Sequence, residues 1–348
     1  MKRRKTIAII MLTVTVIMII NSESIADVTL NSMKITATNI IPSLFPFMVI
    51  SSLIVSSGAA DILGRIIPIS RIFKLPHCAS TPIMIGALCG FPLGAVSSVE
   101  LYKNGYISKV QTEVLISISN ITGPSFIVFV IGKSIWNNIR FGIFLYLFQL
   151  ISAISAALIV NRIIYPVTAS DQSVQFTVKS TPFLESLSDA IRNASLSSLT
   201  VCGFITFFAV IIGSSSEMLS FIPQSITSFI SAILEFSEAS RNSVLLPSVT
   251  GAFMCGFAIG WSGVSVLCQT AYFTAPHGLS LKRYITVKIL EGIFLGILSS
   301  FYAHISRLEY TQTSITVFEP IGYTHYYALL GLLTTFYSVY MIKKRKYA

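Results

Sequence analysis

Long apolar stretches recur along this chain of 348 residues, separated by short polar segments. Hydrophobic residues make up 53% of the sequence and charged residues only 11%, whereas soluble domains carry roughly 25% charged residues. Inside a bilayer every backbone polar group must be bonded within the protein, so apolar runs of about 20 residues fold as helices. The sequence therefore predicts an all-α polytopic membrane protein with 7–8 transmembrane helices and two re-entrant helical hairpins.

The first predicted hairpin covers residues 80–104. It consists of two apolar runs, each too short to cross, joined by the sequence GFPLG at positions 90–94. Runs of about 10–14 apolar residues are typical of re-entrant segments. Glycine and proline let the chain reverse at membrane depth, provided that protein or water covers the freed backbone groups.

A broken helix is predicted directly afterwards, over residues 110–132. This run is long enough to cross, but Asn120-Ile121-Thr122-Gly123-Pro124 interrupts its middle. Proline removes a helical hydrogen bond and glycine is a weak helix former. A re-entrant segment beside a broken helix is the usual pointer to the substrate site of a transporter.

The second half of the chain repeats this order of parts. Residues 42–165 form the predicted first repeat, residues 166–182 a polar linker, and residues 183–303 the second repeat. A second hairpin is predicted at 244–276, around the sequence GWSG at 260–263. Residues 61–79 are predicted to form an amphipathic interfacial helix, matched in order by residues 218–241. Such repeats are common in secondary transporters and are often inverted.

The two ends of the chain carry basic clusters beside apolar runs. Residues 1–41 are predicted to hold an uncleaved signal anchor and an interfacial segment, with a cleaved signal peptide as the alternative. Residues 304–348 are predicted to form a loop, a last transmembrane helix and a basic tail.

The sidedness of the membrane has two solutions. If residues 218–236 cross, there are eight spans, and most lysines and arginines face the cytoplasm, as the positive-inside rule favours. If they lie in the interface, there are seven spans and the repeats are inverted, but the basic tail faces outward. Charge favours eight spans, symmetry favours seven, and both stay open.

Several other functional classes are disfavoured. The net charge of +10 comes largely from basic clusters beside apolar runs, which indicates contact with the lipid bilayer and its headgroups rather than with nucleic acid. The five cysteines stand singly without a CxxC pair, and there is no HxxxH, GxSxG or phosphate-loop motif. We therefore expect no enzyme activity, no metal and no cofactor, and a homo-oligomer is left open.

Four motifs resemble a known family. They are GFPLGA at 90–95, NGYISKVQTE at 104–113, SNITGPSF at 119–126 and WSGVSVLCQ at 261–269. Together with SLFPF at 43–47, they resemble the sporulation integral membrane proteins of the nucleoside-recognition (Gate) family. The resemblance covers roughly residues 40–130 and 185–300.

The resemblance implies a fold like that of concentrative nucleoside transporters, with two hairpins and two broken helices around a midplane site. It further implies a stage V sporulation protein that moves dipicolinic acid from the mother cell towards the forespore, and hence lies in the outer forespore membrane. Two positions depart from the family pattern: Leu93 replaces a small polar residue and Val96 replaces a lysine. The second departure removes a counter-charge for a dianion. The alternatives are a nucleoside or other small-solute permease and a non-transporting spore-envelope scaffold.

Hairpin tips and helix breaks present unpaired backbone N–H groups, which suit a small organic anion. The predicted substrate-binding residues are Gly90, Phe91, Gly94, Asn120, Thr122, Gly123, Ser125, Gly260, Trp261, Ser262, Gly263 and Gln269. Phe91 and Trp261 are predicted to stack on a flat aromatic acid. The alternative is that the small residues merely allow close helix packing.

One acidic residue, Glu291, lies within an otherwise apolar span. Ionisable residues at such positions are expensive and by default indicate a functional site, so we predict a role in ion coupling. The alternative is a structural ion pair with Lys288, one turn earlier on the same face.

Overall fold

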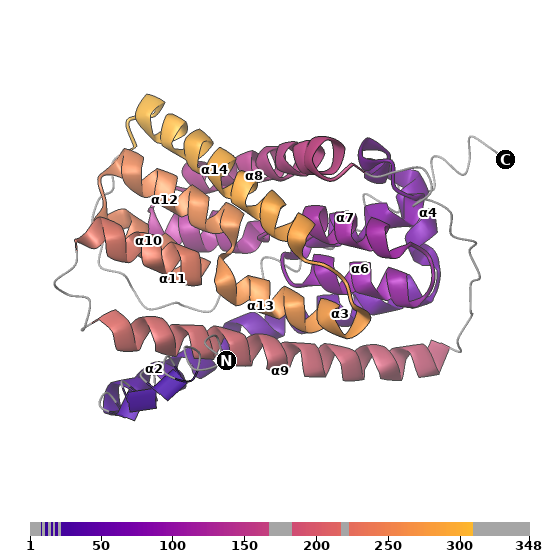
Figure 1. The fold of residues 1–348 in the computed structure, drawn as a ribbon, viewed down its shortest axis with the longest axis horizontal. Coiled ribbons are helices and arrows are strands. Elements are labelled where there is room, and N and C mark those ends of the chain that lie inside the picture. The colour runs from indigo at the N-terminus through magenta and orange to yellow at the C-terminus, as the bar shows by residue number, and fades with distance from the viewer. Residues whose placement is uncertain are drawn as a thin grey trace.

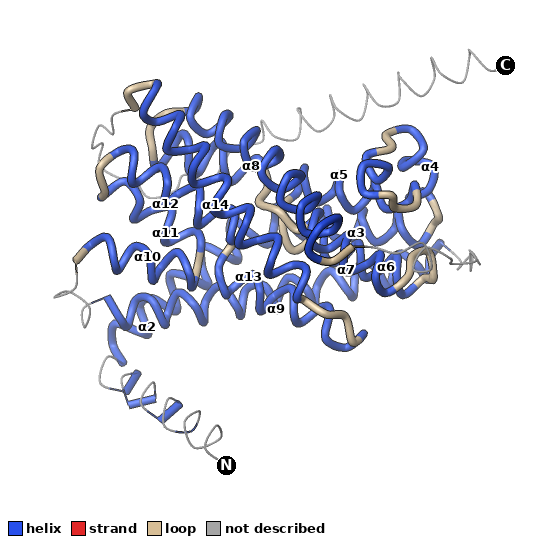
Figure 2. Tube along the Cα trace, turned by 45° about the horizontal axis from the view of Figure 1, so that its top comes forward, coloured by secondary structure: helices blue, strands red, loops and turns tan. Residues whose placement is uncertain are grey.

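The computed structural model describes residues 22–166, 183–216 and 223–308, together with positions 8, 11–12, 15–16 and 18–19. Throughout these residues the secondary structure is helical, with short connecting loops (Figure 2). Four helical stretches are long and apolar enough to cross a membrane: Ile139–Ile164, Phe183–Ile212, Ser248–His277 and Lys282–Ile305. A fifth candidate is a bent pair, Leu44–Ser56 with Ala59–Ile66. The chain is therefore a helical membrane protein.

Three predicted parts fall wholly or mainly outside the described residues. They are the signal anchor, the polar linker and the last helix with its basic tail.

The chain enters its first half through α2 (Ser22–Ile35), a π-helical turn (Thr36–Ile40) and α3 (Ile41–Ser56). The path then turns by 95° into α4 (Ala59–Ile66), and the left-handed backbone of Gly58, with φ 75°, lies at this corner.

The amphipathic helix predicted over residues 61–79 is wrong beyond the end of α4. That segment continues as two 3-10 turns, Ile69–Phe73 and His77–Ala79, which follow Pro68 and Pro76. Proline cannot donate a helical hydrogen bond and disfavours a helical conformation in the residue before it, so a continuous helix is disfavoured here. Cys78 is buried in the core, where burial raises the pKa of its thiol to about 12 and keeps it a neutral packing group.

Two short helices follow, α5 (Ser80–Cys89) and α6 (Leu93–Lys103), which contact each other as a helical hairpin. Next comes α7 (Lys109–Ser119), whose start is fixed by a capping box between Ser108 and Gln111. The chain is non-helical from Asn120 to Gly123, and then continues in the π-helical segment η4 (Ser125–Ile135). The long helix α8 (Ile139–Ile159) and a π-helical turn (Val160–Ile164) complete this half.

The second half begins with α9 (Phe183–Ser216), followed by α10 (Gln224–Leu234) and α11 (Phe236–Asn242). After a 3-10 turn (Ser243–Leu245) come α12 (Ser248–Trp261) and α13 (Gly263–Thr274). A 3-10 turn (Ala275–His277) leads into α14 (Lys282–Ile305), the last helix of the described residues.

The hairpin predicted at residues 244–276 is wrong. Helices α12 and α13 run on in one general direction and together form one candidate span, Ser248–His277, interrupted at Ser262 (Figure 1). The fold-back lies earlier, between α10 and α11, which contact each other across Glu235. A single left-handed residue, Ser262 with φ 69°, interrupts the helix without reversing it.

With this correction the two halves share one order: a hairpin, an interrupted helix and a long helix. In the first half these are α5–α6, α7–η4 and α8, and in the second α10–α11, α12–α13 and α14. The two hairpins lie towards opposite ends of the molecule (Figure 1), so the halves run in opposite directions. The long helices α8 and α14 pack against each other between them.

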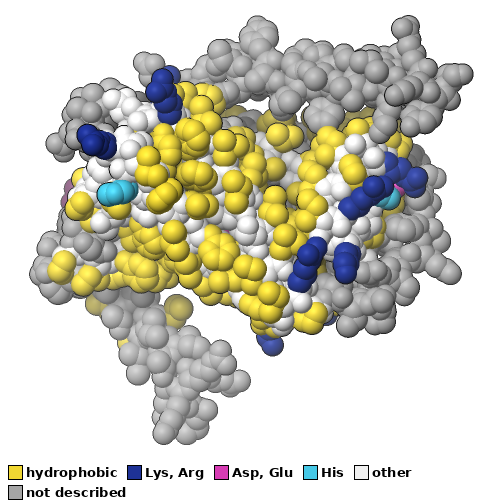
Figure 3. Space-filling view, turned by 90° about the horizontal axis from the view of Figure 1, so that it is seen from above, with side chains coloured by type: hydrophobic (Ala, Val, Ile, Leu, Met, Phe, Trp, Pro, Cys, Tyr) yellow, Lys and Arg dark blue, Asp and Glu magenta, His cyan; other side chains and the backbone are white. Residues whose placement is uncertain are grey.

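The outer face is strongly apolar, and hydrophobic side chains cover much of the surface in Figure 3. Along α8 and α14 the exposed apolar residues recur every four positions, which places them on one side of each helix. They are Ile143, Leu147 and Ile151 on α8, and Ile289, Ile293 and Ile297 on α14. Exposed stripes of this kind fit contact with lipid chains rather than with water.

Candidate functional site

In each half the tip of the hairpin touches the break of the next interrupted helix. A Cβ placed on Gly90 would lie 2.6 Å from the backbone nitrogen of Gly123, so only glycine allows this approach. In the second half a Cβ on Gly263 would lie 2.9 Å from the carbonyl oxygen of Leu234. The two backbone contacts are thus equivalent parts of the two repeats.

Three phenylalanine rings join the two halves at the centre. The ring of Phe91, at the first hairpin tip, packs edge-on against Phe236 of the second hairpin, with ring centroids 5.0 Å apart. Phe126, just after the first break, packs against the same ring at 5.1 Å. We call the meeting of the two tips and the two breaks the central junction.

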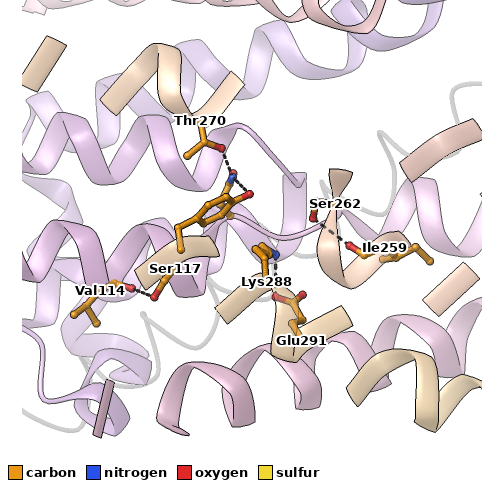
Figure 4. Close-up of polar contacts among 9 residues, drawn as sticks. Val114, Ser117, Ile259, Ser262, Thr270, Lys288 and Glu291 are labelled. Carbon is orange, nitrogen blue, oxygen red and sulfur yellow. Dashed lines mark hydrogen bonds and ion pairs between the residues drawn. The ribbon is translucent and has the colours of Figure 1, made fainter. Parts of the chain in front are cut away.

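Asn120, at the first break, reaches into the second half of the chain. Its side chain is completely buried, and its Nδ2 donates to Thr270 Oγ1 at 2.9 Å and to Tyr284 Oη at 3.1 Å (Figure 4). These partners lie on α13 and α14. Its Oδ1 atom is buried without a hydrogen-bond partner, and so is Oγ1 of Thr122. A buried polar atom without a partner is costly, so these two oxygens are positions where a ligand can be bound.

Gln149 of α8 supports the unwound backbone. In the orientation that satisfies its amide, it accepts a hydrogen bond from Thr122 N at 2.8 Å and donates one to Thr122 O at 3.1 Å. Both backbone groups that the break releases at this residue are thereby bonded. The sequence analysis missed Gln149, although an amide inside an apolar span is a signal that can be found.

Lys288 and Glu291, one turn apart on α14, form an ion pair that is buried inside the protein. The distance from Lys288 Nζ to Glu291 Oε2 is 2.9 Å and both side chains are 0% exposed (Figure 4). The Lys288 ammonium also lies 5.9 Å from the ring centroid of Tyr284, within range of a cation–π contact. Glu291 Oε1 is buried without a partner. The ion pair with Lys288 that the sequence offers as the structural alternative is therefore present. The role of Glu291 in ion coupling stays a prediction.

Glu235, at the tip of the second hairpin, is only 3% exposed and caps α11. Its carboxylate accepts hydrogen bonds from the backbone N–H groups of Ser237 at 2.8 Å and Glu238 at 2.9 Å. A carboxylate at a helix N-terminus is favourable because it satisfies free N–H groups and meets the positive end of the helix dipole. The sequence analysis did not place this residue at a hairpin tip.

The structure brings together most of the predicted site residues of the first half. Gly90, Phe91, Asn120, Thr122 and Gly123 lie at the central junction. By contrast, a Cβ on Gly94 would lie 2.0 Å from Ser119 O, which is a helix-packing contact between α6 and α7. Ser125 is exposed at the start of η4.

In the second half, Trp261, Ser262 and Gly263 lie at the break between α12 and α13. Trp261 Nε1 donates to Ile233 O at 3.0 Å, and buried Ser262 donates to Ile259 O at 3.1 Å (Figure 4). Because the indole is bonded to α10 and Phe91 packs on Phe236, each ring of the predicted stacking pair already has a partner.

The last two predicted residues of this half make contacts within or between helices. A Cβ on Gly260 would lie 2.6 Å from Gly292 Cα, which is a packing contact with α14. Gln269 is buried, and its hydrogen bond runs to Ser265 of the same helix at 3.4 Å.

Comparison with known proteins gives one informative similarity. The chain is 23% identical over 295 residues to the sporulation integral membrane protein YlbJ of Bacillus subtilis (strain 168). The aligned region covers 74% of this chain and 72% of YlbJ. No family model matches the chain. No solved structure matches it either. The name of this relative agrees with the apolar helices in indicating an integral membrane protein.

Proposed function

We propose that this chain is a transporter of a small organic anion, dipicolinate, and moves it from the mother cell towards the forespore during sporulation. Three observations support the proposal: the motif resemblance, the similarity to a sporulation integral membrane protein, and the central junction. The junction carries the proposal, because tips and breaks that meet at mid-molecule are the usual form of a transporter's substrate site. The site of action we propose is the outer forespore membrane.

In the bilayer we propose eight crossings with both hairpins re-entrant from opposite sides. Six crossings lie in the described residues: α3, α7–η4, α8, α9, α12–α13 and α14. The other two are the signal anchor and the last helix, which rest on the sequence alone. This arrangement removes the conflict over sidedness. Residues 218–236 no longer need to cross, the repeats are inverted, and the basic tail faces the cytoplasm.

Charge supports the same arrangement. The end of the molecule that holds α4, the α6–α7 connection and the start of α14 carries Arg65, Arg71, Lys74, Lys103, Lys109, Arg162, Lys282 and Arg283. The opposite end carries Lys34, Lys133, Arg140, Arg241 and Arg307. By the positive-inside rule the first end faces the cytoplasm.

The solute is proposed to bind at the central junction. Asn120 Oδ1 and Thr122 Oγ1 are buried there without partners. The unwound backbone beside them starts η4, whose N-terminal N–H groups favour a carboxylate. Glu291 is proposed to couple binding to an ion.

Binding decides among the candidate functions. We expect dipicolinate to raise the melting temperature of the purified chain in detergent, since a ligand that binds only the folded state stabilises it. Labelled dipicolinate should also enter vesicles that contain the protein. A shift with nucleosides alone supports the nucleoside permease. No shift and no flux with any solute supports the scaffold.

Asn120→Ala and Trp261→Ala are each expected to lower dipicolinate uptake into vesicles at least about tenfold, or ~1.4 kcal/mol. The first removes the bonds to Thr270 and Tyr284, and the second frees the α12–α13 break from α10. Ser300→Ala is the matched control, because that hydroxyl donates only within α14, to Ile297 O. Unchanged uptake in both variants, at equal membrane insertion, would remove the assignment of the site.

A further inference from the structure

Five side chains and the backbone of Thr122 form a series of contacts around the junction, which the chain itself closes between Thr122 and Asn120. Asn120 bonds Tyr284, whose ring lies under the Lys288 ammonium, and Lys288 pairs with Glu291. The Glu291 carboxyl lies beside the Gln149 side chain, which in turn holds the backbone of Thr122, two residues from Asn120. We call this series the polar ring. It joins α7, α8 and α14 with the unwound backbone.

The polar ring is under-satisfied. Three of its oxygens, Asn120 Oδ1, Thr122 Oγ1 and Glu291 Oε1, are buried without a partner. Among the described residues, Lys288 makes one hydrogen bond, to Glu291 Oε2, although an ammonium has three donors. Fully buried ion pairs are stable only where further hydrogen bonds satisfy the remaining groups. The ring thus has both donors and acceptors left for a ligand.

Other charges lie away from this pair. The helices packed against α14 are chiefly α7, α8 and α12. Their titratable residues are Lys109, Glu113, Arg140, Tyr146 and Cys255, of which Lys109 and Arg140 lie in the first turn of their helix. Glu113 accepts a hydrogen bond from Ser280 N, and Tyr146 donates one to Ala87 O. Cys255 is buried in an apolar cluster with Trp136 and Phe141. On α14 itself Tyr284 is the neighbouring titratable group.

We propose that Lys288 is the counter-charge for a carboxylate of the transported anion, and that Glu291 takes up one proton when the anion displaces it from Lys288. This inference rests on the proposed function and names both its coupling ion and its anion-binding residue. In the empty protein Lys288 neutralises Glu291. In the loaded protein it neutralises the solute carboxylate while Glu291 is protonated and neutral.

Charge conservation favours this exchange. One proton enters with the carboxylate that Lys288 binds, so this carboxylate adds no net charge to the buried ring. The second carboxylate of dipicolinate keeps its charge and is proposed to bind the N-terminal N–H groups of η4.

The pH dependence of binding by the full-length protein tests the proton. The probe is dipicolinate, whose carboxyl groups are ionised at neutral pH. Coupled uptake of one proton requires the apparent affinity to fall about tenfold per pH unit wherever Glu291 is ionised in the empty protein. Glu291→Gln, whose thermal unfolding without solute is measured first, is expected to bind dipicolinate with no such pH dependence. A pH-independent wild type would overturn the inference.

A double variant tests the counter-charge. Removing one partner of a buried ion pair leaves an unpaired charge that can prevent folding, so Lys288→Met is combined with Glu291→Gln. This variant is expected to keep the thermal unfolding of the solute-free protein and to lose dipicolinate affinity at least about a hundredfold. The uncharged diamide of the same acid should bind both proteins equally.

The outcomes separate this inference from the proposed function. If the wild type and the double variant bind dipicolinate equally and with the same pH dependence, the pair is purely structural and the inference alone is wrong. If the wild type binds no dipicolinate at any pH, the proposed function fails and the inference with it.

Discussion

Gly94→Ala is expected to prevent stable docking of the α5–α6 hairpin onto α7. A Cβ at this position would lie 2.0 Å from the carbonyl oxygen of Ser119 and 2.5 Å from its carbonyl carbon. Gly86 of α5 faces the same carbonyl, with a Cβ distance of 1.7 Å. Both obstacles are backbone atoms, which cannot change rotamer, so the helices must separate.

The expected cost exceeds the ~1–3 kcal/mol of ordinary overpacking in a core. We expect a large fall in the melting temperature of the detergent-solubilised protein and in the yield of monodisperse material. Because Gly94 is also a predicted binding residue, the solute-free protein must be measured. A loss of stability without solute assigns Gly94 to packing, and a loss of solute affinity at unchanged stability assigns it to binding.

Gly203→Ala provides the matched control for this change. Gly203 lies in α9, and a Cβ there would meet no atom within 4 Å. Alanine is the better helix former by roughly 1 kcal/mol, so the melting temperature is expected to stay equal or rise slightly. If both variants unfold at the same temperature, α6 does not dock on α7 as described.

Local chemistry explains what the sequence predicts correctly about chain breaks. The interruption after Ser119 follows from Asn120, Gly123 and Pro124, which are poor helix formers in sequence. The turn between α5 and α6 likewise lies at a glycine–proline sequence, where Gly90 has φ 86°. In both places the signal lies in the residues that form the break, so no distant part of the chain is needed to detect it.

The second hairpin was misplaced because glycine has two uses that composition does not distinguish. Three glycines of residues 244–276 serve close packing. A Cβ on Gly251 would meet Ser243 O at 2.2 Å, one on Gly256 would meet Leu295 O at 2.7 Å, and Gly260 faces α14. The actual fold-back at Glu235 has neither glycine nor proline. Its extended backbone and its cap on α11 give only a weak local signal.

The contacts that close the polar ring cannot be predicted from local patterns at all. Asn120 bonds residues 150 and 164 positions further along the chain. Such pairings depend on how α13 and α14 cross α7, and hence on the tertiary fold. Lys288 and Glu291 are different, since their spacing of three residues on one helix predicts the contact directly.

Cysteine labelling is expected to place the two ends of the α12–α13 segment on opposite sides of the membrane. Single cysteines would replace exposed residues in a background without the five native cysteines: Asn104, Asn137, Leu245 and Lys282. The protein would be expressed in non-sporulating cells, where it inserts into the cell membrane. An impermeant maleimide applied from outside these intact cells should label positions 137 and 245. Positions 104 and 282 should react only after permeabilisation, because they lie at the end rich in lysine and arginine.

This result is all-or-none, which makes it the sharpest test of the fold in the bilayer. If positions 245 and 282 react from the same side, residues 248–277 form a hairpin after all and the repeats are not inverted. Alternating access needs a junction that each hairpin can open towards a different side, so two hairpins that enter from one side would remove that mechanism. Labelling at opposite sides would instead leave the central junction between two hairpins that open towards opposite sides, as alternating access requires.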